Sequence, residues 1–252
     1  MSVKTAADIK AMREGGRRLA ETLQAVAART RVGLTTKQVA EIAKAELLKH
    51  DLQAILVGYQ GYQEVMCVSL NDEVVHGVPS TKRVIKEGDL VTLDLTAAYE
   101  GLIVDTATTL FMGEAAAMSP EIKHLLEGAK QALEAGIDAL KGEGTRVGDI
   151  AAAIQATLDS YNLGIVRDLV GHGVGHGVHE DPNVPNYGMA GSGPSLRAGE
   201  TIAIEPMATL GGWQVDILAD GWTVASRDHS LAAHFEHTVL VTESGAEILT
   251  TF

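Results

Sequence analysis

The feature that most constrains the fold is an internal repeat at a shift of 111 residues. Residues 86–94 (KEGDLVTLD) align with residues 197–205 (RAGETIAIE) at basic, glycine, acidic and β-branched or leucine positions, and both copies end on a carboxylate. Two copies are too few for a solenoid, so the halves, about residues 1–112 and 113–252, should fuse into one domain spanning 1–252. We expect an α+β fold of two helix-helix-sheet halves related by a pseudo-twofold.

Each half begins with two amphipathic segments, in which apolar residues recur every three or four positions and charged residues fill the other face. The predicted helices cover about residues 5–28, 36–49, 120–141 and 147–161. Thr35 or Thr36 is suited to cap the second helix, and Ser119 before Pro120 marks the start of the third.

A β-hairpin is predicted where residues 88–96 and 102–111 flank a Glu-Gly dipeptide at positions 100–101. With a two-residue loop, Asp94 and Asp105 become diagonal neighbours on one face of the hairpin. Two acids on an otherwise apolar sheet would cost several kcal/mol each if they were buried unpaired, so a cation is expected beside them. The alternative is a pair of solvent-facing aspartates on an edge strand.

Residues 170–182 (VGHGVGHGVHEDP) combine glycine and histidine in a way that excludes a helical zinc site, because the glycines destabilise a helix interior. In an extended chain His172 and His176 share one face, while His179 lies on the other unless a bulge intervenes. Different histidines of this segment can therefore have different roles.

The end of the chain is predicted to be a strand set. The predicted strands begin at residue 199 and include 213–218, 221–225 and 233–242. The last of them carries His234 and Glu236 on one face and His237 on the other. We expect both histidines to be structural partners of Glu236.

The candidate metal ligands in these segments are four carboxylates and one imidazole: Asp94, Asp105, His172, Glu205 and Glu236. Two divalent ions balance the four negative charges, and bridging carboxylates would hold such ions about 3.5–4 Å apart. Oxygen-rich ligation with one imidazole favours Mn, Fe, Co or Zn. A water shared by two metals becomes a nucleophile near neutral pH, so the predicted chemistry is hydrolysis of an amide or a phosphate ester.

Composition excludes several other classes of protein. A formal net charge of −13 argues against a nucleic-acid-binding protein. The single cysteine, Cys67, cannot form an internal disulfide, which favours a reducing compartment. We find neither a signal peptide nor a run of about twenty apolar residues, so a cytoplasmic protein without a membrane partner is expected.

Taken in order, five motifs resemble those of the type I methionine aminopeptidases, which have the pita-bread fold around a central curved antiparallel sheet. The motifs are residues 67–79 (CVSLNDEVVHGVP), 171–175 (GHGVG), 178–182 (VHEDP), 204–207 (IEPM) and 235–238 (FEHT). The resemblance implies removal of the N-terminal methionine of newly made proteins, preferentially before a small second residue. The nucleophile would be a water or hydroxide that bridges two metals.

The resemblance also assigns the ligands. Asp105 and Glu236 would bridge the two metals, Asp94 would complete the shell of one, and His172 and Glu205 would complete that of the other.

Further residues take their expected roles from the same resemblance. Glu205 would act as general base, His179 would stabilise the oxyanion, and His76 would contact the peptide near the scissile amide. The apolar pocket for methionine maps onto Tyr59, Tyr62, Cys67 and Trp222.

Three positions depart from the family pattern. Gln60 stands where many bacterial members have histidine, Val104 where glycine commonly precedes the second aspartate, and Val178 where an aromatic residue is frequent. A smaller Val178 would loosen the pocket. The N-terminal zinc-finger extension of some eukaryotic relatives is not expected here.

The expected substrates are the N-termini of peptides and nascent chains, with transient ribosome association and a monomeric enzyme. Two alternatives are an Xaa-Pro aminopeptidase or prolidase, which uses a similar metal cluster, and an inactive pita-bread module that binds peptides or proteins. The complete ligand set argues against the inactive module.

Overall fold

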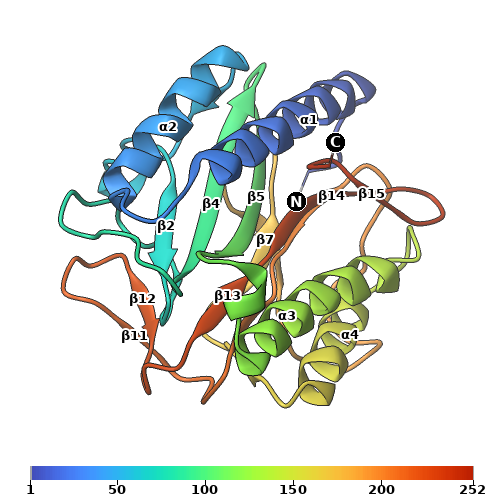
Figure 1. Ribbon diagram of the computed structural model, residues 1–252. Helices are drawn as coiled ribbons and strands as arrows, with labels where there is room; N and C mark the ends of the chain where they lie inside the picture. Colours follow the sequence, from blue (N-terminus) through green and yellow to red (C-terminus); the bar gives the residue numbers. More distant parts are fainter. Residues whose placement is uncertain (1, 252) are drawn as a thin grey trace.

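The computed structural model describes residues 2–251 (Figure 1). Within this range the helices are α1 (Ala6–Arg29), α2 (Thr36–Lys49), α3 (Pro120–Ala139) and α4 (Val147–Ser160), with 3₁₀ turns η1 (Tyr59–Gly61) and η2 (Ala115–Ala117). The predicted helix boundaries agree with these to within two residues.

Local side-chain chemistry explains where the helices begin. Thr5 and Asp8 form a capping box at α1, in which each side chain accepts a hydrogen bond from the backbone N–H of the other residue. Thr35, rather than Thr36, caps α2 in the same way with Gln38. The Ser119 hydroxyl accepts a hydrogen bond from the Ile122 N–H in the first turn of α3.

The strands are mostly short. They are β1 (Gln53–Ala54), β2 (Cys67–Leu70), β3 (Glu73–Val75), β4 (Leu90–Tyr99), β5 (Leu102–Phe111), β6 (Gly164–Ile165), β7 (Gly171–Gly173), β8 (Glu180–Val184), β9 (Thr201–Ile204), β10 (Met207–Thr209), β11 (Val215–Ile217), β12 (Val224–Ser226), β13 (Ala232–His234), β14 (Glu236–Val241) and β15 (Ala246–Ile248). Among the described residues the main sheet has the order β1-β4-β5-β14-β9-β7-β8, with β2 beside β4 and β15 beside β14. Its strand pairs are antiparallel. Two small sheets, β13-β10-β6 and β11-β12-β3, adjoin it.

The β4–β5 hairpin has the predicted register. Glu100 and Gly101 form the loop with φ of 50° and 80°, the left-handed conformation that the two-residue turn requires at both positions. Tyr99 consequently pairs with Leu102, and Asp94 pairs with Ala107. The expected diagonal placement of Asp94 against position 105 is therefore confirmed.

The prediction of one continuous strand at residues 233–242 is wrong. The chain leaves the small sheet after β13 and enters the main sheet at β14, with Phe235 between the two strands. A matching switch occurs at Glu205-Pro206, between β9 and β10, and β10 pairs with β13 while β9 pairs with β14. Two neighbouring strands thus change sheet together, which periodicity along one chain cannot reveal.

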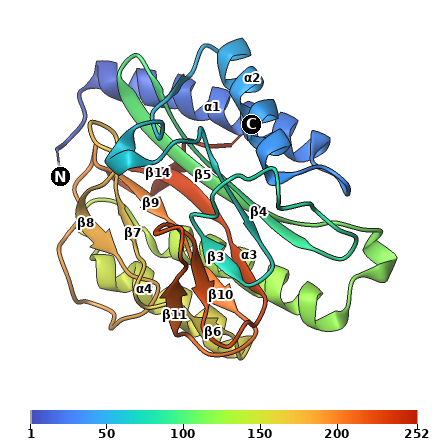
Figure 2. The same cartoon turned by 90° about the vertical axis from the view of Figure 1, so that its left-hand side faces the viewer.

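Each half has its own apolar core beneath its helices. In the first half α1 packs on β4 and β5 and α2 packs on β1 and β2, around buried residues such as Leu19 and Leu93. In the second half α3 packs on β9 and β14 and α4 packs on β6 and β8, around Ile150 and Ile204. The side view shows α1 and α2 against one part of the sheet and α3 and α4 beside another (Figure 2). The pairing of β5 with β14 joins the two halves.

Close packing of α1 predicts one sensitive position. In Gly16→Ala, the new Cβ would overlap the Leu249 carbonyl group, which belongs to the backbone and cannot rotate away. We expect the free energy of unfolding to fall by about 1–3 kcal/mol in urea denaturation. Gly245→Ala is the matched control, because its Cβ would meet nothing within 4 Å. Equal stability of the two variants would contradict this packing.

Candidate metal centre

Every site residue predicted from the sequence lines one cavity of about 170 Å³. These residues are Tyr59, Tyr62, Cys67, His76, Asp94, Asp105, His172, His179, Glu205, Trp222 and Glu236. The first half of the chain supplies the two aspartates, and the second half supplies the other three candidate ligands. The cavity therefore draws on both halves of the repeat.

The β4–β5 hairpin places and orients Asp105. The Thr96 hydroxyl and the Thr106 N–H both donate to Asp105 Oδ1, at 2.8 and 3.0 Å. A Thr238 hydroxyl on β14 ties the Asp105 backbone to the neighbouring strand. Because both donors use Oδ1, the second carboxylate oxygen remains available toward the cavity.

Three donor groups come close enough to share an ion. One ligand atom each of Asp105, His172 and Glu236 lies within 4.8 Å of the others. His172 Nδ1 lies 2.9 Å from the Gly173 carbonyl oxygen, so this nitrogen carries the proton and Nε2 has a free lone pair. Glu205 Oε1 lies 3.5 Å from His172 Nε2, at the edge of this group.

The electrostatics of the cavity call for a cation. Burial raises the pKa of Asp94, Glu205 and Glu236 well above the usual range, and repulsion from neighbouring carboxylates adds to the shift. Burial also raises the pKa of Asp105 to about 7, although its two hydrogen bonds oppose the shift. Four acids in one dry cavity are costly unless a cation compensates them.

The donor set fits a divalent metal. Carboxylate oxygens with a neutral imidazole suit Mn, Fe, Co or Zn. Burial lowers the pKa of His172 to about 4, which keeps its imidazole neutral and able to coordinate at physiological pH. This chemistry supports the metal use predicted from the sequence.

Bends in the glycine-rich segment bring His172 and His179 together, with ring centroids 4.4 Å apart. His176 instead turns outward, where its Nδ1 lies 2.8 Å from the Ser2 hydroxyl. The bulge that the glycines allow is therefore present, and β7 and β8 shift register after His172.

His76 has a φ of 59°, a left-handed conformation that costs a non-glycine residue about 1–2 kcal/mol.

A buried ion pair anchors the loop that carries His179. Lys4 Nζ lies 3.1 Å from Glu180 Oε2, and the Lys4 side chain is fully buried. Glu180 Oε1 accepts the N–H groups of His176 and Gly177. Sequence reasoning missed Lys4, because a lysine just before a helix cap is usually solvent-exposed.

The predicted methionine pocket is apolar and adjoins His179. Tyr62 and Trp222 meet edge to face, with ring centroids 4.9 Å apart, and Cys67 packs beside them. Burial raises the pKa of the Cys67 thiol, as expected for a packing residue rather than a nucleophile. Tyr59 has an additional contact, because its hydroxyl lies 2.9 Å from His179 Nδ1.

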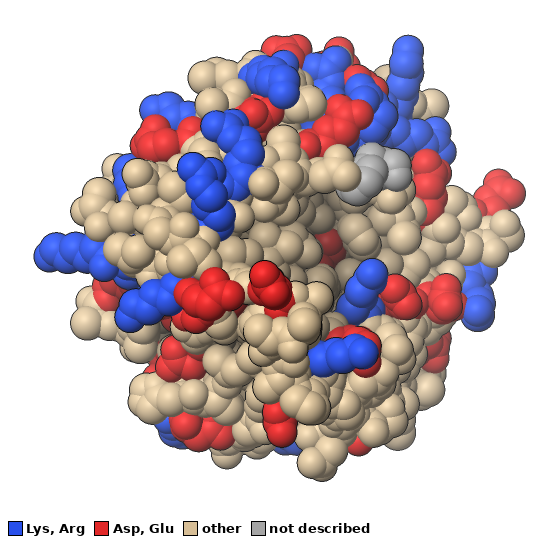
Figure 3. Space-filling model, in the orientation of Figure 1, with Lys and Arg blue, Asp and Glu red and all other residues tan. Residues whose placement is uncertain are grey.

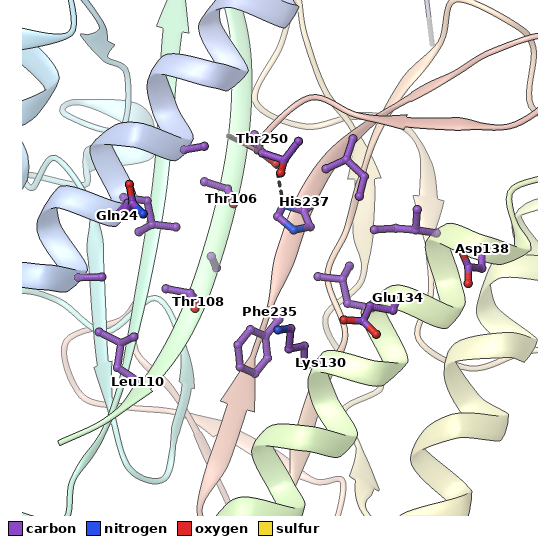
Figure 4. Close-up of a pocket in the computed structure, with 18 residues that line it drawn as sticks. Gln24, Thr106, Thr108, Leu110, Lys130, Glu134, Asp138, Phe235, His237 and Thr250 are labelled. Carbon is purple, nitrogen blue, oxygen red and sulfur yellow. Dashed lines mark hydrogen bonds between the residues drawn. The ribbon is translucent and has the colours of Figure 1, made fainter. Parts of the chain in front are cut away.

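The expected pairing of His237 with Glu236 is absent from the contacts of the described residues. Alternation along β14 sends His237 into a separate groove of about 720 Å³ between α1 and α3. There its Nδ1 lies 2.9 Å from the Thr250 hydroxyl (Figure 4). Figure 3 shows this face hollowed between the helices, with acidic and basic residues around the rim.

The fold and the site together define a metallohydrolase, with a buried carboxylate cluster assembled from two fused halves. Residues 10–243 match the model of metallopeptidase family M24. The methionine aminopeptidase of Clostridium acetobutylicum is 39% identical over 248 residues, covering 98% of each chain, and that of Aquifex aeolicus is 42% identical, covering 96% of each. The chain therefore belongs to metallopeptidase family M24, whose members use divalent metal.

Solved structures support the same assignment. A methionine aminopeptidase from Thermotoga maritima superposes with a TM-score of 0.96 at 42% identity, and the match covers all of both chains. A prolidase from Pyrococcus furiosus shares the fold, with a TM-score of 0.77 at 21% identity and 65% of its chain covered. The pita-bread fold expected from the motifs is confirmed.

The Lys4–Glu180 ion pair predicts a loop-specific effect. In Lys4→Met the new side chain has a similar volume but no charge, so Glu180 is left buried without its cation. We expect amide hydrogen exchange in residues 174–180 to become at least about tenfold faster, which corresponds to about 1.4 kcal/mol of local stability. Arg13→Met, which removes the exposed Arg13–Glu247 pair, is the control. Equal protection of this loop in both variants would refute the anchoring role.

Proposed function

We propose that this chain is a metal-dependent aminopeptidase that removes N-terminal methionine, preferentially when the second residue is small. One observation carries the proposal. A single cavity combines a carboxylate–imidazole cluster with an apolar aromatic pocket, and three further histidines line it. Relatives that are about 40% identical over nearly the whole chain bear the name of this activity.

Five residues are proposed to hold two divalent ions drawn from Mn, Fe, Co and Zn. Asp105 and Glu236 would be shared by the two ions. Asp94 would bind one ion only, and His172 and Glu205 would bind the other. Support comes from the charge of the donor set, since one divalent ion leaves four buried carboxylates over-charged. When bound, the ions would polarise the first peptide carbonyl and acidify the attacking water.

The protein's own groups complete the hydrolysis. Glu205 would accept a proton from the water as its oxygen bonds to the carbonyl carbon. His179, oriented by the Tyr59 hydroxyl, would donate a hydrogen bond to the carbonyl oxygen as negative charge develops there. Cleavage of the C–N bond then releases methionine and a new N-terminal amine, which takes up the proton. His76 would hold the peptide near the scissile amide.

The pocket chemistry suits the methionine side chain. Tyr59, Tyr62, Cys67 and Trp222 line the apolar part of the cavity, and an unbranched thioether packs well on aromatic rings. Val178 is buried at the same cavity, where a larger side chain would narrow it. We therefore propose methionine as the preferred first residue, with some tolerance for leucine.

We propose that the whole chain is one catalytic domain, since neither half alone contains the ligand set. The protein would act as a cytoplasmic monomer on peptide and nascent-chain N-termini, with transient ribosome contact. The buried thiol of Cys67 fits a reducing compartment. Within residues 2–251 the helices are too short or too polar to cross a membrane.

Cleavage of short peptides tests this activity. Metal-stripped protein reconstituted separately with Mn, Co, Fe(II) and Zn should release methionine from Met-Ala-Ser faster than leucine from Leu-Ala-Ser. Asp105→Asn should lower kcat/KM by at least about a hundredfold, because a bridging ligand is lost. Preferred cleavage of Met-Pro-Ala would favour the prolidase-like alternative, and no cleavage with any metal would favour the binding module.

The raised carboxyl pKa values predict how pH affects the metal-free protein. The unfolded chain loses these protons first, near pH 4, so native stability should fall as pH rises from there through about 7. Asp105→Asn should therefore raise Tm more at pH 7.5 than at pH 5. Manganese should stabilise the wild type more at pH 7.5, since coordination requires ionised carboxylates. A pH-independent effect of Asp105→Asn in thermal unfolding would contradict the cluster's electrostatics.

A further inference from the structure

One histidine in the cavity has no role so far. His234 is 2% exposed and lines the same space as the candidate ligands. Its Nδ1 and Nε2 atoms are both buried without a hydrogen-bond partner in the part of the chain that the structure describes. A buried donor left unsatisfied costs about 1–3 kcal/mol, so the groups that face this ring are of interest.

The backbone holds His234 firmly in place. It ends β13 and pairs with Met207 on β10. Its N–H donates to the Thr109 hydroxyl, which in turn donates to the His234 carbonyl oxygen, at 3.0 and 2.8 Å. The sheet switch at Phe235 then lets both His234 and Glu236 line the cavity, although they belong to different sheets.

The nearest charged group to the His234 ring is Glu205. His234 Nε2 lies 3.6 Å from Glu205 Oε2, while His172 Nε2 lies 3.5 Å from Oε1. Glu205 thus stands between two imidazoles, one at each carboxylate oxygen. The Asn186 side chain donates to the Glu205 backbone carbonyl and fixes the main chain there.

We propose that His234 is a positioning residue: its Nε2–H faces Glu205 Oε2 across 3.6 Å, closes to a hydrogen bond when the centre holds metal, and keeps this carboxylate toward the His172 side of the centre. The inference rests on the proposed function, in which Glu205 is a ligand and general base. Metal-bound carboxylates are commonly oriented by such outer partners. His234 lies outside the close group of donor atoms formed by Asp105, His172 and Glu236, but so do the proposed ligands Asp94 and Glu205. The variants below therefore distinguish orientation of Glu205 from direct coordination by His234.

Two substitutions separate positioning from packing. His234→Leu fills much of the space but removes the donor, whereas His234→Gln retains an N–H at similar reach. His237→Leu is the control, because it removes a histidine three positions along the chain whose ring lies in the groove rather than in the cavity. Stripped proteins would be titrated with Mn²⁺ and Co²⁺ by calorimetry, with the Co²⁺ visible absorption recorded at each equivalent.

We expect His234→Leu to weaken one of the two metal equivalents by about 10- to 100-fold, leaving the other nearly unchanged. At saturating metal, kcat for Met-Ala-Ser should stay lowered while KM changes little, because the group acts on catalysis rather than on peptide binding. His234→Gln should recover most of both losses. The control should match the wild type in metal affinity.

Three results would overturn the inference. Unchanged metal affinity and unchanged kcat in His234→Leu would show that His234 does not position Glu205. Parallel weakening of both equivalents together with a lower Tm would indicate packing. Failure of His234→Gln to rescue, with an altered Co²⁺ spectrum, would make His234 a ligand. A wild type that binds fewer than two metals or does not cleave Met-Ala-Ser would instead refute the proposed function, so the two failures are distinguishable.

Discussion

The structure depends above all on the burial of four carboxylates in one small cavity. Their mutual repulsion and lost hydration oppose folding, and the same two effects raise the pKa of Asp94, Glu205 and Glu236. Two apolar cores, one under each helix pair, supply the stability that holds the acids together. A bound cation then converts an unfavourable cluster into a binding site, so the same charges that destabilise the metal-free fold attract the metal.

The central sheet keeps this chemistry apart from the packing that supports it. Glu236, the first residue of β14, lines the cavity, while Phe235 just before the strand and His237 within it line the groove between α1 and α3. Strand alternation therefore assigns neighbouring residues to separate environments. Alternation alone does not bring residues of different sheets together. The switch of two paired strands between sheets does so, and it places Glu205, His234 and Glu236 at one cavity.

The proposed ligands and the proposed substrate-contacting groups are held by different means. Asp94 and Asp105 lie on a regular hairpin, where register alone sets their spacing. His179 lies in a bend next to Glu180, which pairs with Lys4 and accepts the His176 and Gly177 N–H groups, and His76 follows β3 in a left-handed conformation. Rigid strands suit the metal cluster, which tolerates little displacement, while anchored loops suit groups that meet a substrate.

Much of this organisation was predictable from the sequence, for local physical reasons. The caps at Thr5, Thr35 and Ser119 and the Glu100-Gly101 turn are decided within a few residues, so the helix starts and the hairpin register follow directly. The internal repeat and the motif order also indicated the fold and the set of residues that share the cavity.

The tertiary structure alone decided the rest. Four features depend on partners more than a hundred residues away or on strands of another sheet: the break at Phe235, the inward turn of His179, the buried Lys4 and the buried ring of His234. A two-residue or 3.6-residue period reports which side of a local element is apolar. It carries no information on where a chain changes sheet, and that change determines which polar groups meet in the cavity.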